Sequence, residues 1–343
     1  MRHRHIGRFM AFLGALGAVV PVAAPLAAND TTAELATGGL QIATSPDIEM
    51  ASEDLAISPD RIRVAYVFIN HAGRPIDVPV AFPLPDLRQD GDADATVPTD
   101  DARNPFAFRL KVDGMPVAVQ LEQHAIVGGV DRTAVLTGLG IPLVPTSSHT
   151  SAALDRLPAA TRAKLVTMRL VNMVMAETEE PARQHLQPNW TLHSTYYWTQ
   201  HFPSDRPVHI EHDYQPSIGS ASQTGIGLPN WRQKRGNAHY APDYCPDADL
   251  LDTIASAMRS RNLDYPPFGE QRIDYILHTG ANWRGPIGRF HLTIDKGDPQ
   301  TLVSLCMDGL TKTGPTTFEL TRADFRPAGD LKVLLLVPTA RPD

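Results

Sequence analysis

The sequence is poor in cysteine, in lysine and in recognisable catalytic motifs. It contains 2 cysteines and 6 lysines in 343 residues. The G-x-S-x-G, H-E-x-x-H, C-x-x-C, Walker and dinucleotide-binding signatures are all missing. No reaction can therefore be named from the sequence, and whether the protein is an enzyme stays open, with a non-enzymatic role favoured.

Basic clusters and long apolar runs are missing too. Lys and Arg number 31 against 38 Asp and Glu, a net charge of −7. A net acidic chain without basic clusters argues against nucleic acid and anionic membrane surfaces as partners. No apolar run reaches the roughly 20 residues that span a bilayer, so no transmembrane segment is expected after signal cleavage.

Residues 1–28 have the layout of a secretory signal peptide. Arg2, Arg4 and Arg8 precede the apolar run 9–20, and small residues up to Ala28 suit a cleavage site. Cleavage leaves 315 residues with a net charge of 28 − 38 = −10. The protein is expected to be exported, to the periplasm in a Gram-negative cell and otherwise to the medium.

The mature chain is predicted to be mainly β, with two β-sandwich-like domains and short helical insertions. Alternation of apolar residues over 61–68 and the Asp113-Gly114 hairpin signal are typical of paired strands. The N-terminal domain is expected over 29–183, with a helical segment at 151–170. The C-terminal domain, mostly antiparallel β, is expected over 184–343, with a helix at 247–261 that begins after an Asp cap.

The two cysteines, Cys245 and Cys306, are expected to form a disulfide. An even count in an exported protein favours a bond over the alternative, a nucleophilic cysteine with a histidine base. The bond would close a loop of about 60 residues, worth roughly 4 kcal/mol in the chain-entropy model.

An aromatic strand at 190–202 is predicted to form a hairpin with 208–214. If paired residues sum to 410, His201 lies opposite His209, with Glu211 as a diagonal neighbour. Two opposed imidazoles and a carboxylate could bind a divalent metal. An exposed polar face with two unlinked histidines is the favoured alternative.

An acidic segment at 90–101 partly matches a calcium-binding loop. Asp90, Asp92, Asp94 and Asp101 occupy loop positions 1, 3, 5 and 12. Position 6 is Ala95 instead of glycine, and no helices flank the segment, so a solvated loop between strands is favoured.

The segment 215–244 is predicted to be a long irregular loop, either functional or mobile. Near its centre lie Trp231, Arg232, Lys234 and Arg235, which could hold an acidic ligand, a sugar or a partner. A solvated loop tip is the plainer interpretation.

Short sequence matches run through nearly the whole mature chain. They are 29–40, 47–50, 52–55, 57–59, 80–86, 196–198, 209–212, 280–283, 285–287, 295–297, 303–304 and Cys306. In these segments the chain resembles the bacterial family called domain of unknown function 4424, with a small departure at Leu305 and 307–309. The resemblance implies an exported bacterial protein and supplies no catalytic residues.

The leading hypothesis is a non-enzymatic binding or interaction module of the cell envelope, whose partner is an envelope protein or a small ligand. The alternative is a metal-binding protein or metal-dependent hydrolase that uses His201, His209 and Glu211. No cofactor is predicted apart from this divalent metal.

Overall fold

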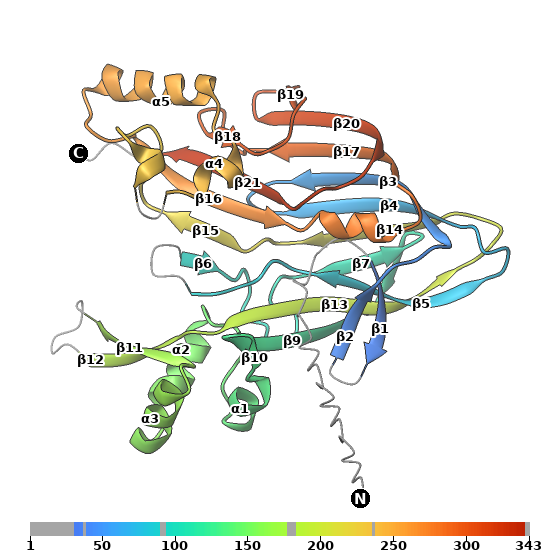
Figure 1. Cartoon of the computed structure of the whole chain (residues 1–343), viewed down its shortest axis with the longest axis horizontal. Coiled ribbons are helices and arrows are strands. Elements are labelled where there is room, and N and C mark those ends of the chain that lie inside the picture. The colour runs from blue at the N-terminus through green and yellow to red at the C-terminus, as the bar shows by residue number, and fades with distance from the viewer. Residues whose placement is uncertain (1–30, 37–38, 90–93, 177–182, 235–236, 340–343) are drawn as a thin grey trace, which may run out of the picture.

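The computed structural model describes residues 31–36, 39–89, 94–176, 183–234 and 237–339. Within these ranges the protein is mainly β, as predicted (Figure 1). A large sheet contributes one face to the main core, and two smaller sheets contribute to the same core. The predicted signal peptide, residues 1–28, lies outside the described residues.

The large sheet has eight strands in the order β19-β20-β17-β3-β4-β14-β7-β8. Their bounds are Thr311–Lys312, Thr317–Phe325, Ile287–Asp295, Ile48–Ile57, Ile62–Asn70, Val208–Tyr214, Arg109–Val112 and Met115–Val117. All neighbours are antiparallel except β3 and β17, which run parallel, with Ser52 opposite Arg289. Next to that pair, β3 has a bulge between Met50 and Ser52.

Local sequence explains the strands of this sheet. In β4, alternate residues from Ile62 to Phe68 are buried, as their apolar alternation predicts. Asp113 and Gly114 have φ values of 49° and 79°, the left-handed geometry of a two-residue hairpin turn, and they join β7 to β8.

The six-stranded sheet has the order β10-β9-β13-β5-β1-β2. Its strands span Val130–Asp131, Gln120–Val127, Thr191–Phe202, Ile76–Pro83, Thr31–Ala36 and Gly39–Ala43. In β13, every second residue from Leu192 to Phe202 is buried, so the prediction of a half-buried aromatic strand is confirmed.

The five-stranded sheet has the order β18-β21-β16-β15-β6. Its strands span Leu302–Ser304, Leu331–Pro338, Phe268–Tyr275, Ile218–Ala221 and Asp94–Thr96. A separate pair is formed by β11 (Val171–Ala176) and β12 (Arg183–Pro188).

Helices lie in two groups. The helices α1 (Thr133–Gly138), α2 (Ser148–Asp155) and α3 (Ala159–Thr167) contribute to an apolar cluster with β9, β12 and β13. The helices α4 (Tyr240–Tyr244) and α5 (Ala248–Arg261) cover one face of the five-stranded sheet, together with the short 3₁₀ helix η1 (Trp231–Gln233). A second 3₁₀ helix, η2, spans His278–Asn282.

The two predicted helical regions are present. The first, at 151–170, divides into α2 and α3 around Pro158, which immediately precedes α3. The second is α5, where the Asp247 side chain accepts a hydrogen bond of 2.8 Å from the Leu250 backbone N–H and so caps the helix. None of the helices that the structure describes is long and apolar enough to cross a bilayer.

Sheet topology differs from the prediction in two respects. The prediction of a hairpin between 190–202 and 208–214 is wrong. Strand β13 pairs with β5 and β9 in the six-stranded sheet, whereas β14 pairs with β4 and β7 in the large sheet. The sheets also do not divide the chain at residue 183. The large sheet joins β3 and β4 to β14 and β17, and the six-stranded sheet joins β5 and β9 to β13.

Candidate functional site

A charged hollow lies on the outer face of the five-stranded sheet. It has a volume of about 250 Å³ and is called the recess below. Strands β15, β16 and β21 form its floor, α4 forms one wall, and the segment after β5 forms another. Its lining residues are Leu84, Pro85, Asp86, Leu87, Arg88, Phe106, Tyr214, Pro216, Ser217, Gly219, His239, Asp243, Tyr244, Arg272, Asp274 and Lys332.

Strand alternation places the charged groups of the floor. Arg272 and Asp274 are two positions apart in β16, so their side chains lie on the same face of the sheet. Lys332 is the cross-strand partner of Asp274 in β21, and Gly219 is the partner of Arg272 in β15. A Cβ atom at Gly219 would lie 3.6 Å from Nε of Arg272, so the glycine leaves space above the strand for that side chain.

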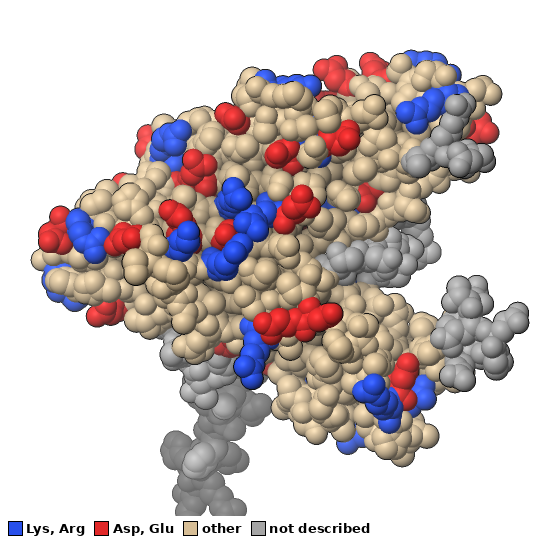
Figure 2. Space-filling model, turned by 180° about the vertical axis from the view of Figure 1, so that it is seen from behind, with Lys and Arg blue, Asp and Glu red and all other residues tan. Residues whose placement is uncertain are grey.

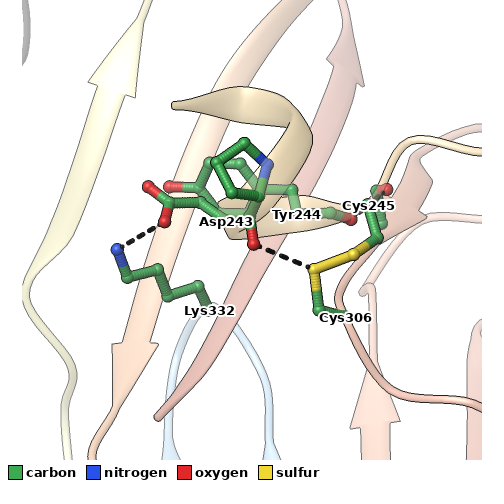
Figure 3. Close-up of a disulfide and its surroundings, with 7 residues drawn as sticks. Asp243, Tyr244, Cys245, Cys306 and Lys332 are labelled. Atoms are coloured by element: carbon green, nitrogen blue, oxygen red, sulfur yellow. Dashed lines mark hydrogen bonds and ion pairs between the residues drawn. A yellow bond between two sulfur atoms is a disulfide. The ribbon is translucent and has the colours of Figure 1, made fainter. Parts of the chain in front are cut away.

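The disulfide holds the α4 wall beside the floor (Figure 3). Cys245 follows α4 directly and is bonded to Cys306, which confirms the predicted pair. Asp243, two residues earlier, makes an ion pair of 3.0 Å with Lys332. The Ser304 hydroxyl donates a hydrogen bond of 2.7 Å to the backbone carbonyl of Tyr244. Three contacts therefore fix α4 to β18, β21 and the chain after β18.

Two carboxyl groups of the recess have altered acidity. Desolvation raises the pKa of Asp274, and the like charge of Asp243 adds to this effect, while Lys332 and Arg272 oppose it. Desolvation also raises the pKa of Asp86, against the opposing influence of His193 and Arg88. Both carboxyl groups are reached by solvent, but the walls of the recess remove part of their hydration. Each would gain from a positive group brought by a ligand.

The charges of the floor are incompletely paired. The carboxylate of Asp274 makes no hydrogen bond, and no ion pair within 4 Å, to any residue that the structure describes. Arg272 has only its Nε near an acid, 3.9 Å from Glu270, which leaves its two terminal nitrogens without such a contact in the described chain. Glu270 itself is buried and accepts a hydrogen bond of 2.6 Å from the Tyr240 hydroxyl. An unpaired carboxylate and an open guanidinium fork thus lie side by side.

A second, wider hollow lies on the outer face of the large sheet. Its charged lining residues are Asp54, Arg61, Arg63, Arg109, Lys111, Glu211 and Asp213. Asp213 pairs with Arg109 at 2.7 Å and with Arg61 at 3.8 Å. On the side of the molecule opposite to the view of Figure 1, acidic and basic side chains are similarly interspersed (Figure 2). Mutual pairing of its charges makes this hollow the weaker candidate for a ligand site.

The predicted metal residues are not assembled into one site. Nδ1 of His201 lies 2.7 Å from Asp77 of β5, while the backbone N–H of His209 donates to Asp113. Glu211 lies on β14, opposite Ala65 and Lys111. Since β13 and β14 belong to different sheets, the predicted pairing that would juxtapose these groups does not exist. Among the described residues, no group of three or more His, Cys, Asp or Glu could hold a metal ion.

Only part of the predicted calcium loop lies within the described residues. Asp90 and Asp92 lie outside the described residues, and Asp94 begins β6. The side chain of Asp101 accepts a hydrogen bond of 2.9 Å from the backbone N–H of Arg103, as in an ordinary turn. Calcium binding by this segment stays a prediction.

The segment 215–244 is less irregular than predicted, and its tryptophan is buried. The segment contains β15, η1 and α4, and Trp231 is only 6% exposed in the apolar cluster that includes Tyr240 and Ile254. The guanidinium carbon of Arg232 lies 4.5 Å from the Trp231 ring centroid, and Lys234 is exposed. Arg235 lies outside the described residues. Trp231 therefore stabilises the fold and is not available to grip a ligand.

Sequence reasoning did not find the recess. Its charged groups come from four segments that are remote in sequence, and each looks like an ordinary polar residue in its own segment. One signal was available: Asp243 and Tyr244 directly precede Cys245, so the predicted disulfide already marked them as an anchored segment.

Comparison with known proteins gives a family but no activity. No curated protein matches the sequence. A solved structure from Legionella pneumophila, described as "a putative nutrient binding protein", is 14% identical, and the match covers 90% of this chain and 70% of that chain with a TM-score of 0.44. A likeness of this degree carries no argument about function. The model of the family described as domain of unknown function (DUF4424) matches residues 28–334, and the chain therefore belongs to that family.

Proposed function

We propose that the protein is an exported binding module that holds a small polar ligand in the recess. The observation that carries this proposal is the pair of unsatisfied charged groups, Asp274 and the fork of Arg272, on the floor of a hollow with fixed walls. Charged groups that lose hydration without gaining partners cost free energy, and a bound ligand would recover it.

The size and lining of the recess suit a small molecule. Its volume of about 250 Å³ is slightly below the usual range for ligand sites, roughly 300–1,000 Å³, and so suits a ligand of few atoms. Phe106, Tyr214 and Tyr244 add apolar and aromatic surface to the charged groups. This combination of apolar walls and a few converging polar groups is typical of small-molecule sites.

Ligand occupancy tests the proposal directly. The mature protein, purified without denaturation from the envelope of the cell that makes it, is analysed by native mass spectrometry for a bound small molecule. Gly219→Leu places a bulky side chain on the floor of the recess and is expected to abolish the extra mass. Gly329→Leu is the matched control, because it lies outside the recess and a Cβ atom there would meet nothing within 4 Å.

Two results contradict the proposal. One is a wild-type protein that carries no small molecule and shows no thermal shift with any compound of a metabolite panel. The other is a folded Gly219→Leu variant that keeps the ligand. If a ligand is released in chemically altered form, the protein is an enzyme and not a binding module. Asp86 and Asp274, whose pKa values are raised, would then be the candidate proton donors.

Export is part of the proposal and has a separate test. Intact mass of the protein from the envelope fraction is expected to correspond to a chain that begins at Asn29. A full-length chain confined to the cytoplasm contradicts export.

A further inference from the structure

We infer that the ligand of the recess is a small zwitterion, with an ammonium group bound over Asp274 and a carboxylate bound by Arg272. A dipeptide with free termini is the simplest member of this class. The inference rests on the proposed function and specifies the ligand that the same site takes.

The ammonium end is assigned to Asp274 because this carboxylate is unpaired and two further carboxylates line the same recess. Asp274 is the unpaired one, Asp243 lies close enough to raise its pKa, and Asp86 faces the recess from the segment after β5. Lys332 already pairs with Asp243 at 3.0 Å and so compensates only part of this negative charge. An ammonium group donates up to three hydrogen bonds and matches such a set of acceptors.

The carboxylate end is assigned to Arg272 because its outer nitrogens are open while its orientation is fixed. Nε of Arg272 points to Glu270, and the Tyr240 hydroxyl holds that carboxylate in place. The guanidinium therefore presents its fork to the recess, the geometry that binds a carboxylate through two parallel hydrogen bonds.

Spacing and net charge favour a molecule with both groups. Arg272 and Asp274 are two residues apart on one strand, roughly 7 Å between Cα atoms. Two residues of an extended peptide span about the same distance. The recess contains Asp86, Asp243 and Asp274 against Arg88, Arg272 and Lys332, a formal balance of 3 − 3 = 0. A ligand of zero net charge fills it without leaving an excess of either sign.

The test is titration calorimetry of the mature protein with four matched probes. They are alanyl-alanine, its N-acetyl derivative, its C-terminal amide, and N-acetyl-alanyl-alanine amide, which lacks both charges. Alanyl-alanine is expected to bind at least tenfold more tightly than either singly blocked probe, and the doubly blocked probe most weakly.

Two variants assign the ends separately. In Asp274→Asn, the affinity ratio of alanyl-alanine to its N-acetyl derivative is expected to fall toward one. The affinity ratio of alanyl-alanine to its C-terminal amide should stay as in the wild type. In Arg272→Gln, the affinity ratio of alanyl-alanine to its C-terminal amide is expected to fall toward one instead. Asp252→Asn, on the exposed side of α5, is the control, and circular dichroism establishes that each variant is folded.

The outcomes separate this inference from the proposed function. The zwitterion is wrong if the four probes bind equally, if none binds at millimolar concentration, or if neither variant changes the ratios. If the protein nevertheless carries a molecule that Gly219→Leu removes, the recess is a binding site for another class of ligand. If it carries none, both proposals fail.

Discussion

Single residues set how this protein responds to pH. His124, on β9, lies with Nε2 2.6 Å from Glu122 and Nδ1 2.7 Å from Asp131. Burial by itself lowers the pKa of His124, but the hydrogen bonds and charges of these two carboxylates outweigh it and raise the pKa above 6.5. The protonated imidazole thus links β9 to β10 through Asp131.

The raised pKa gives a pH dependence with a definite sign. Stability from His124 is fully present below the unfolded pKa of about 6.5 and is lost as the pH rises through the higher folded pKa. His124→Gln should therefore lower the free energy of unfolding, measured with urea, more at pH 5.5 than at pH 8.5. The same change at His149, which is exposed on α2, serves as control. An equal loss at both pH values for His124→Gln would contradict this account.

Gly288 shows how one missing side chain permits a strand pairing. A Cβ atom at this position would lie 2.6 Å from the carbonyl oxygen of Ala51, at the bulge of β3. Gly288→Ala must push the two strands apart, and overpacking of this kind costs about 1–3 kcal/mol. Gly329→Ala, which meets nothing within 4 Å, should leave stability nearly unchanged. The free energies of unfolding of the two variants are compared by urea denaturation. Equal values would refute the steric argument.

At the scale of elements, α4 depends on its connections because it is only five residues long. The disulfide closes a loop between residues 61 positions apart, and its removal should cost about 4 kcal/mol in the chain-entropy model. The double variant Cys245→Ser/Cys306→Ser is expected to unfold at lower urea concentration and to bind ligand more weakly, since Asp243 and Tyr244 lose their anchor.

The two effects can be separated by measuring ligand binding at a temperature where the variant is still folded. Unchanged affinity there would show that the Asp243–Lys332 pair and the Ser304 hydrogen bond suffice to hold α4. Unchanged urea stability would contradict the structural role of the disulfide.

Elements that depend on local sequence could be predicted. The strands with which they pair in the sheets could not. The alternation in β4 and β13, the Asp247 cap of α5 and the Asp113-Gly114 turn all depend on residues close in sequence. The partner of β13 depends on which apolar faces meet in the core. A five-residue connection to β14 suggested a hairpin, but the chain crosses there from one sheet to the other.

The same reason explains the outcome for the sites. The disulfide was predictable because a chain with two cysteines has one possible intramolecular pair, and the sequence predicts export to an oxidising compartment. The recess was not, because Asp86, Asp243 and Asp274 meet only through the packing of three separate segments. His201 and Glu211 looked like neighbours only under a strand register that does not occur.

For the whole molecule, sheets shared between the two halves of the chain imply cooperative unfolding. Strands β3 and β4 precede residue 183, but their hydrogen-bonded neighbours β17 and β14 follow it. Calorimetry of the mature protein should therefore show a single transition, and a fragment of residues 29–183 should fail to fold alone. Two resolved transitions, or a folded fragment with native-like circular dichroism, would contradict this prediction.

The parallel pairing of β3 with β17 also sets an order of events as the chain emerges from the ribosome or a translocation pore. Ser52 meets Arg289, so the pair joins positions 289 − 52 = 237 residues apart. β3 can form a hairpin with β4 early, but its other edge stays open until β17 (Ile287–Asp295) has been made. An open edge beside apolar side chains readily pairs with foreign strands. We therefore expect the incomplete chain to be prone to aggregation through that edge for most of the time that its synthesis takes, and a chaperone that covered the edge would prevent this.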